Sequence, residues 1–291
     1  MISVITPTYN RAYILTQCYK SLCAQTDTDF EWIVVDDGST DNTEGLVRGF
    51  KEEDRIAIRY LWQPNGGKHR AHNTGVTVAS GELAVCLDSD DMLSPEAIET
   101  ASCVWRKQAD SESIGILALR GDMTGHRPIC SSIPEGLLRS SMSGLRDRHG
   151  FKGDTVLFFK TEVLKEHLFK EFENEKFLSE NNLYCDLDLL GKMILLNRVL
   201  YYCEYRPDGL TAKYHKLLFD NPKGTADTYY KMALVGHPFY KALKYAIISR
   251  AYNNLSPKKS RLRFERRRHL MAMARIAAPA FAYKYLRKYK K

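Results

Sequence analysis

Apolar runs alternate with segments of helical spacing along the first third of the chain. Short apolar runs predict strands at 2–6, 31–36, 56–62 and 83–88. Apolar side chains three or four positions apart predict helices at 12–25, 39–48 and 69–79. A further helix is predicted to begin at Pro95, in the first helical position behind a capping Ser94.

This alternation predicts an α/β fold, in which a parallel sheet carries helices on both faces. In such sheets, ligands bind where the carboxyl ends of the strands meet the following loops. Polar motifs stand at three of these positions, namely 7–10, 36–39 and 88–91. A ligand site is therefore predicted at this edge of the sheet.

The remainder of the chain is less regular. A strand is predicted at 156–159, helices at 161–167 and 181–197, and a last strand at 199–204. The chain after Tyr205 is predicted to be mostly helical. A basic helix is expected to begin at Ser256-Pro257, and Pro279 is expected to kink or end it.

Composition favours a globular protein. Hydrophobic residues make up 44% and charged residues 27% of the chain, which argues against wholesale disorder. None of the seven cysteines forms a C-x-x-C pair, so we expect reduced thiols and neither a structural zinc site nor a disulfide framework. We expect no signal peptide, and no stretch approaches the about 18 apolar residues of a membrane-spanning helix.

The net charge of +8 is unevenly distributed. Residues 241–291 contain 16 Lys and Arg but a single acid, Glu265, so this segment carries +15 and the rest of the chain −7. The two parts are therefore expected to meet different electrostatic environments.

The motif Asp88-Ser89-Asp90-Asp91 follows the fourth predicted strand. Carboxylates one residue apart at a strand end can project toward one site, and they suit a hard cation such as Mg²⁺ or Mn²⁺ beside substrate phosphates. Such a cation would neutralise charge on a diphosphate leaving group. The plainer interpretation is an acidic turn that caps the next helix.

Two further motifs at this edge suit a nucleotide. In Asp36-Asp37-Gly38-Ser39, one acid can accept a hydrogen bond from a base or ribose, while the other can belong to an Asx turn at Gly38. In Pro7-Thr8-Tyr9-Asn10, backbone groups can meet the nucleotide and Tyr9 can stack on its base. Taken alone, the second motif is only a turn with an aromatic residue.

A glycine pair, Gly66-Gly67, precedes the third predicted helix. Glycines there let backbone N–H groups approach an anion, and Lys68 or Arg70 can neutralise phosphate. The spacing is not that of a P-loop, and no G-x-G-x-x-G follows the first strand, which weighs against a dinucleotide oxidoreductase. His69 and His72 are expected to lie on the phosphate side or to be structural, rather than to bind a metal.

Together the motifs resemble the family two glycosyltransferases of GT-A fold. They match in order and spacing over about residues 1–110, as Ser3-Val4-Ile5-Thr6-Pro7-Thr8-Tyr9-Asn10, Val34-Val35-Asp36-Asp37-Gly38-Ser39-Thr40-Asp41, Gly66-Gly67-Lys68 with Asn73-Thr74-Gly75, and Leu87-Asp88-Ser89-Asp90-Asp91. The resemblance implies a Rossmann-like domain over 1–215, whose mostly parallel sheet has helices on both faces. Its nucleotide-binding half would be 1–110 and its acceptor half 111–215, and a helical basic region would follow at 216–291.

The resemblance also implies the chemistry. Such enzymes invert the anomeric centre in one in-line displacement, usually from a UDP-sugar, and Mn²⁺ or Mg²⁺ is the expected cofactor. We expect transfer of a hexosyl or N-acetylhexosaminyl group to a hydroxyl of a bacterial cell-surface glycan or lipid-linked acceptor. The implied direct metal ligand is Asp90, with Asp88 near the ribose or metal. The implied nucleotide-sugar-binding residues are Pro7, Thr8, Tyr9, Asp37, Lys68, Asn73, Asp88 and Ser89.

The resemblance further implies a carboxylate base that deprotonates the acceptor. In the family this base often stands in a Glu-Asp pair that opens a helix, and Glu180 occupies the corresponding place. Asn181 stands where Asp is often found, so Asp186 and Asp188 remain alternatives. Asp154 is a candidate for the acceptor side.

The basic segment 241–291 mixes Lys and Arg with aromatic residues. A solvated helical face, a nucleic-acid surface and a membrane surface all suit this mixture. We favour an anionic membrane surface over nucleic acid, and therefore expect a cytoplasmic protein that is peripheral on the inner face of the cell membrane. Self-association through this segment is a further possibility.

Two other functions remain open at this point. The first is a catalytically inactive GT-A domain that acts as a membrane-associated scaffold in glycan assembly, although the intact aspartates favour an enzyme. The second, a nucleotidyltransferase, usually needs a glycine-rich phosphate loop directly after the first strand, which residues 7–11 do not provide.

Overall fold

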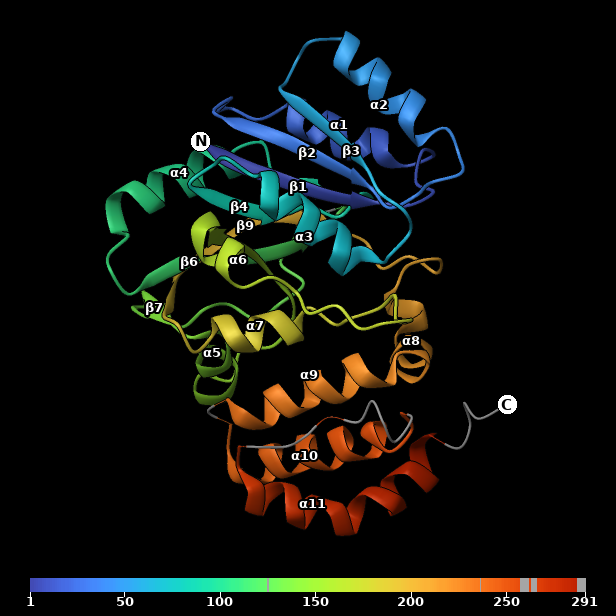
Figure 1. Ribbon diagram of the computed structural model, residues 1–291. Helices are drawn as coiled ribbons and strands as arrows, with labels where there is room; N and C mark the ends of the chain where they lie inside the picture. Colours follow the sequence, from blue (N-terminus) through green and yellow to red (C-terminus); the bar gives the residue numbers. More distant parts are fainter. Residues whose placement is uncertain (125, 236, 257–261, 263–265, 287–291) are drawn as a thin grey trace. The chain divides into compact units, whose positions relative to one another are not determined.

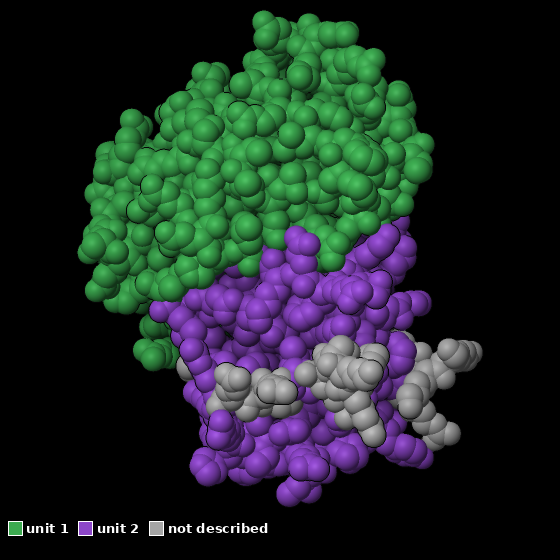
Figure 2. All heavy atoms as spheres, viewed as in Figure 1, with its two compact units in different colours: residues 1–168, 190–204 green, residues 169–189, 205–291 purple. Residues whose placement is uncertain are grey.

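The computed structural model describes residues 1–124, 126–235, 237–256, 262 and 266–286 (Figure 1). The chain divides into two compact units, coloured separately in Figure 2. Unit 1 comprises 1–168 and 190–204, and unit 2 comprises 169–189 and 205–291, so the units interleave along the chain. The domain boundary expected at residue 215 stays a prediction.

Unit 1 is built on one sheet. In the described part of the chain nine strands form it, in the order β3-β2-β1-β4-β8-β6-β9-β5, with β7 beside β9. The strands are β1 (Ile2–Thr8), β2 (Phe30–Asp36), β3 (Ile58–Trp62), β4 (Leu83–Cys86), β5 (Met92–Leu93), β6 (Ser113–Asp122), β7 (Arg139–Ser140), β8 (Thr155–Lys160) and β9 (Lys192–Cys203).

The first four strands are parallel, as the sequence predicts. Strand β1 lies between β2 and β4, and β3 pairs with the outer side of β2. The direction changes at β8, which is antiparallel to both β4 and β6, whereas β6 and β9 are parallel. The predicted α/β GT-A-like fold is confirmed, and its sheet is mixed in the second half.

Helices cover both faces of this sheet (Figure 1). The helices of unit 1 are α1 (Leu15–Cys23), α2 (Thr43–Glu52), α3 (Lys68–Val78), α4 (Ala97–Gln108), α5 (Met142–Arg148) and α6 (Thr161–Glu166). Strand side chains alternate between faces, so Val4 and Trp32 pack with the apolar sides of α1, α2 and α4. Helix α3 lies against the other face, where Gly75 sits beside Ile5 and Val35.

One element of the second half is predicted wrongly. The helix expected at 181–197 ends at Leu187, where α7 (Asn181–Leu187) stops, and β9 begins at Lys192. The run Met193–Leu196 is one part of this strand and pairs with β6. The strand expected at 199–204 is therefore the second part of a longer one.

The start of one predicted helix also differs from expectation. Helix α4 begins at Ala97 rather than Pro95, because Ser94 closes a turn by accepting the Ala97 N–H at 3.0 Å. The basic helix expected from Ser256-Pro257 falls mainly on residues outside the described ranges. Pro279 lies inside α11 (Arg268–Phe281), which passes directly into a π-helical turn at Ala282–Leu286.

The regular elements among the described residues of unit 2 are all helical, as expected for the chain after Tyr205. It contains α7, a short 3-10 turn (Thr211–Lys213), α8 (Tyr214–Asp220), α9 (Pro222–Leu234), α10 (Phe239–Asn253) and α11 with its π-helical turn. Alanines at the contacts among α9, α10 and α11 let these helices approach closely. No helix within the described ranges is both long and apolar enough to cross a bilayer.

Candidate functional site

The loops that follow β1 and β2 are fastened to each other. Asn10 adopts a left-handed conformation with φ of 54°, which asparagine tolerates better than most residues. Its backbone N–H donates to Ser39 Oγ at 2.8 Å, and its side-chain oxygen accepts the N–H of Thr40 at 2.7 Å. Asp41 adds a second link by accepting the N–H of Ala12 at 3.0 Å.

The residues expected to contact the nucleotide lie around these loops. Thr8 is buried, and its hydroxyl has no hydrogen-bond partner among the described residues. Tyr9 is 46% exposed, so its ring is accessible to a ligand. Pro7 and Thr8 form the carboxyl end of β1, directly before Tyr9.

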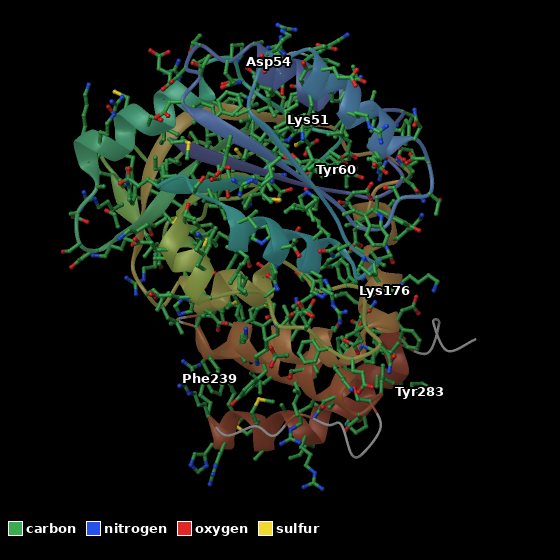
Figure 3. All side chains as sticks on the ribbon, turned by 45° about the horizontal axis from the view of Figure 1, so that its top comes forward. Lys51, Asp54, Tyr60, Lys176, Phe239 and Tyr283 are labelled. Atoms are coloured by element: carbon green, nitrogen blue, oxygen red, sulfur yellow. The ribbon has the colours of Figure 1, made fainter. Side chains whose placement is uncertain are left out.

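Asp36 and Asp37 are both buried, and both carboxylates have internal partners. Asp36 accepts the N–H of Ser39 at 2.7 Å and the hydroxyl of Tyr60 at 2.7 Å. Tyr60, labelled in Figure 3, lies on β3; its burial and the Asp36 carboxylate raise the pKa of the phenol.

Asp37 anchors the segment 63–67. One of its oxygens accepts from the Gln63 side chain at 2.7 Å and the Gly66 N–H at 2.9 Å. The other accepts from the Asn65 side chain at 3.0 Å and the Gly67 N–H at 2.7 Å. These four bonds occupy the acceptor positions of a carboxylate, so the carboxylate acts as a scaffold. Its contact with a nucleotide stays a prediction.

Gly38 allows this loop to approach closely. Its φ is +81°, and a Cβ placed there would stand 2.8 Å from the backbone nitrogen of Asn65. Any larger residue would therefore disturb both the turn and the segment that Asp37 holds.

Helix α3 starts at the site and places Lys68 there. Gly67, with φ of 98°, turns the chain into the helix, and Lys68 is its first residue. The ammonium of Lys68 lies 2.8 Å from Asp88 Oδ1. Two predicted site residues that are 20 positions apart are thus brought into an ion pair. Asn73, also predicted, is buried on the same helix.

The turn Asp88–Asp91 presents three carboxylates with different surroundings. Asp88 pairs with Lys68, while Asp90, whose side chain is 20% exposed, has Arg11 at 4.0 Å. Asp91 is buried and accepts the hydroxyl of Tyr201 at 2.6 Å. The turn is closed by a bond of 3.0 Å from the Asp91 N–H to the Asp88 carbonyl.

Charge crowding separates the pKa values of these acids. Burial raises the pKa of Asp88, but the nearby Lys68 and Arg120 charges outweigh it and hold that pKa below its usual value. Burial and the Asp88 charge raise the pKa of Asp90. The same two causes raise the pKa of Asp91 to about 7. An added cation would relieve this repulsion, so the acids fit the hard cation predicted for them.

Two residues of this site escape prediction from the sequence. Tyr201 on β9 is fully buried and donates to Asp91, and Arg120 on β6 stacks over the Tyr201 ring with its guanidinium carbon 4.2 Å from the ring centroid. A single arginine that ends the apolar run Ile114–Leu119 was the available signal for Arg120. Nothing comparable marks Tyr201 within the strand predicted at 199–204, because its partner Asp91 lies 110 positions away in the sequence.

The predicted base and its alternatives lie mainly in unit 2. Glu180 precedes the first residue of α7; its side chain is exposed and makes no capping hydrogen bond. Asp186 is paired with Lys231, and Asp188 follows the last residue of α7. Asp154 is exposed in unit 1. The assignment of Glu180 as base stays a prediction.

Helix α7 is fastened to α9 by buried polar groups. Asn182 is fully buried and donates to Asp227 at 2.9 Å, and Lys231 donates to the Asn182 side-chain oxygen at 2.9 Å. Lys170 adds an ion pair of 3.0 Å to Asp227. The start of α7, next to Glu180, is therefore held firmly within unit 2.

Side chains of the described residues do not by themselves form a complete metal site. Within the described ranges, no group of three or more His, Cys, Asp and Glu side chains is arranged to hold a metal ion. The cation site predicted at Asp88 and Asp90 stays a prediction.

Comparison with known proteins identifies the family. A model of glycosyl transferase family 2 matches residues 3–167. Glycosyltransferase GlyG of Streptococcus pneumoniae is 32% identical over 215 residues, which cover 69% of each chain. Glycosyltransferase GlyA of the same organism is 28% identical, and the chain spans only 36% of its length.

Solved structures agree on the fold. TarS 1-349 of S. aureus in complex with UDP-GlcNAc has a TM-score of 0.62 at 18% identity, covering 97% of this chain and 91% of the other. The mannosyltransferase PcManGT of Pyrobaculum calidifontis, in complex with GDP-Man and Mn²⁺, has a TM-score of 0.57 at 19% identity, covering 99% and 81%. The motif residues lie at the carboxyl ends of β1, β2 and β4, which agrees with these comparisons. The chain belongs to glycosyl transferase family 2 and is a nucleotide-sugar-dependent glycosyltransferase with a GT-A fold.

Proposed function

We propose that this glycosyltransferase moves a hexosyl or N-acetylhexosaminyl group, with inversion, from a UDP-sugar to a hydroxyl of a cell-surface glycan or lipid-linked acceptor. The observation that carries the proposal is the ion pair between Lys68 and Asp88, with Asp90 and Arg11 beside it. The lysine at the start of α3 thus lies beside the carboxylates of the Asp88–Asp91 turn. The helix start with its lysine suits a diphosphate, and the carboxylates suit a divalent cation.

The donor would lie along the ends of β1, β2 and β4. Tyr9 offers an accessible ring for the base, and the buried Thr8 hydroxyl offers an unused polar group. Lys68, the first residue of α3, would neutralise diphosphate charge, with Asn73 on the same helix and Ser89 next to Asp88. TarS with UDP-GlcNAc and PcManGT with GDP-Man support a nucleotide-sugar donor, and we favour UDP from the sequence resemblance.

The residues that would hold Mn²⁺ or Mg²⁺ are Asp90 and Asp88. Crowded acids with raised pKa values at Asp90 and Asp91 fit such a cation. When bound, it would supply electrostatic stabilisation of the leaving diphosphate. PcManGT is a structural relative in complex with Mn²⁺, which supports this part of the proposal.

The acceptor hydroxyl would be deprotonated by Glu180. Glu180 is exposed and its side chain makes no capping hydrogen bond to α7, and Asp186 forms an ion pair with Lys231. A base that takes the proton as the hydroxyl oxygen attacks the anomeric carbon needs such a carboxylate within hydrogen-bonding reach of the acceptor.

The donor and metal assignments can be tested together. Hydrolysis of a panel of nucleotide sugars would be measured with and without Mn²⁺ for the wild type and Asp90→Asn. The control is Asp54→Asn, which removes one charge at a residue with φ of 50° in a turn remote in sequence from the motif, where asparagine is well tolerated. We expect Mn²⁺-dependent turnover that is lost in Asp90→Asn only. Equal turnover by Asp90→Asn would refute the metal assignment.

We further propose that unit 2 attaches the enzyme to the inner face of the cell membrane. An apolar stripe is exposed on α11 and the π-helical turn that follows it, where Met273, Ile276 and Tyr283 are exposed at 50%, 85% and 70%. Arg268 and Arg275 flank it, and neither α10 nor α11 contains an acid. An exposed apolar stripe with basic neighbours suits a helix that lies in an anionic lipid surface. Figure 3 labels Phe239 and Tyr283 on α10 and on the turn after α11.

Sedimentation with lipid vesicles tests this attachment. The wild type should bind vesicles that contain phosphatidylglycerol and not neutral phosphatidylcholine vesicles. Ile276→Asp should weaken binding, whereas Leu138→Asp, which alters an exposed leucine of unit 1, should not. Unchanged binding by Ile276→Asp would contradict the proposed surface, and binding to neutral vesicles alone would contradict the electrostatic part.

A further inference from the structure

We propose that Tyr201 is a positioning residue that fixes the Asp88–Asp91 turn in the shape needed to hold a divalent cation. This inference rests on the metal-dependent transfer proposed above. It concerns a side chain on β9 that no motif of the first 110 residues contains.

The Tyr201 hydroxyl bonds to both ends of the turn. It donates to Asp91 Oδ2 at 2.6 Å and accepts the backbone N–H of Asp88 at 3.1 Å. The turn itself is closed by the bond from the Asp91 N–H to the Asp88 carbonyl. One hydroxyl thus fixes the first and last residues of a four-residue turn whose middle residues include Asp90.

The hydroxyl is itself held in place from two sides. The backbone of Tyr201 pairs with Leu93 of β5 and with Arg120 of β6. The Arg120 guanidinium lies 4.2 Å from the Tyr201 ring centroid, and its Nε donates to the Thr155 carbonyl at 3.1 Å. Because the tyrosine is fully buried, its side chain has little freedom to move away from the turn.

The arrangement explains how the acids share their tasks. Asp91 is buried and one of its oxygens accepts the Tyr201 hydroxyl, so its role is to stabilise the turn. Asp88 and Asp90 keep partly exposed carboxylates, at 27% and 20%. Groups that orient metal-binding carboxylates through hydrogen bonds commonly change metal affinity or activity by about 10–100-fold when removed.

The test compares Tyr201→Phe with Tyr202→Phe. Both remove one phenolic oxygen from neighbouring positions of β9, but the Tyr202 ring stacks on His126 and no bond joins it to the aspartates in the described residues. Mn²⁺ binding would be titrated by electron paramagnetic resonance in the presence of UDP, and UDP binding without metal by calorimetry. For Tyr201→Phe we expect about 10–100-fold weaker Mn²⁺ binding and unchanged metal-free UDP binding. Tyr202→Phe should match the wild type.

A second pair of variants keeps the idea testable if Tyr201→Phe does not fold. Asp91→Asn retains an oxygen that can accept from Tyr201, whereas Asp91→Ala does not. Mn²⁺ binding should therefore fall further in Asp91→Ala than in Asp91→Asn. Equal losses in these two variants, or Mn²⁺ affinity in Tyr201→Phe within threefold of the wild type, would overturn the positioning role.

The outcome can be separated from that of the proposed function. Metal titration needs no turnover, so a wild type that binds Mn²⁺ but hydrolyses no nucleotide sugar would leave the positioning role supported if Tyr201→Phe binds Mn²⁺ more weakly. A wild type that binds no Mn²⁺ in the presence of UDP would overturn it.

Discussion

Replacing Asp37 by Asn tests whether this carboxylate builds the site or contacts the nucleotide. The four hydrogen bonds that it accepts from the segment 63–67 divide equally between its two oxygens. An asparagine keeps one oxygen and places an NH₂ group where the other oxygen stood. Two part-buried donors, such as the Asn65 side chain and the Gly67 N–H, then lose a carboxylate acceptor, although the Asn65 amide keeps its bond of 2.9 Å to the Asp37 backbone carbonyl.

The expected cost follows from these bonds. A buried donor that loses its partner costs about 1–3 kcal/mol, and because both donors are part-buried and Asn65 keeps one bond, the expected total is also about 1–3 kcal/mol. That is a large part of a typical free energy of unfolding of about 5–15 kcal/mol. Urea unfolding followed by tryptophan fluorescence measures the loss. Asp27→Asn is the control, because its amide keeps an oxygen to accept the Asp29 N–H.

The same variant separates the two roles of Asp37. If the scaffold is its main role, Asp37→Asn lowers the free energy of unfolding by at least about 1 kcal/mol, and any weaker UDP binding accompanies that loss. An unfolding free energy equal to that of the wild type, together with lost UDP binding in calorimetry, would place the carboxylate on the nucleotide and refute this reasoning.

Three further predictions concern other parts of the chain. Burial raises the pKa of Glu31, but hydrogen bonds from Ser80 and Ser3 outweigh burial and lower that pKa. The ionised Glu31 carboxylate therefore stabilises the fold above the ordinary pKa of 4.5, and this stabilisation is lost as the pH falls below that value. Glu31→Gln should flatten the pH dependence of the melting temperature in that range. Glu180→Gln should retain UDP binding in calorimetry and lose sugar transfer. Gly75→Ala should lower the free energy of unfolding by about 1–3 kcal/mol, because its Cβ would stand 2.4 Å from Ile5 on β1.

Two of these have a matched control variant, and each has an outcome that would contradict it. Gly49→Ala in α2 meets nothing within 4 Å and should be neutral or stabilising, by up to about 1 kcal/mol. Equal effects at Gly75 and Gly49 would remove the steric argument. Asp186→Asn should retain transfer, and loss there with retention in Glu180→Gln would exchange their roles. A pH profile of Glu31→Gln that parallels the wild type would show that another acid dominates.

The sequence predicts the nucleotide-binding half well because its signals are local. Each apolar run there is followed within a few residues by a glycine, a proline or an acid, and strand order follows from the helical crossovers between them. Lys68 and Asp88 were both identified, since each belongs to a motif at a strand end or helix start.

The second half is harder to predict because its strands are defined by distant partners. Met193–Leu196 contains good helix formers, yet it lies in β9 because it pairs with β6. Gly191 marks the break, since a Cβ there would stand 2.4 Å from the Glu112 carbonyl. The bond from Tyr201 to Asp91 joins residues 110 positions apart, which no local pattern reveals.

The ion pair between Lys68 and Asp88 has a consequence for how each ligand affects the binding of the other. An anion that takes the Lys68 ammonium competes with Asp88 for it, and a cation that takes the Asp88 carboxylate competes with Lys68. Each incoming ligand therefore removes a competitor of the other. Linkage requires the benefit to be mutual, so the sugar nucleotide and the cation should bind more tightly together than either does alone.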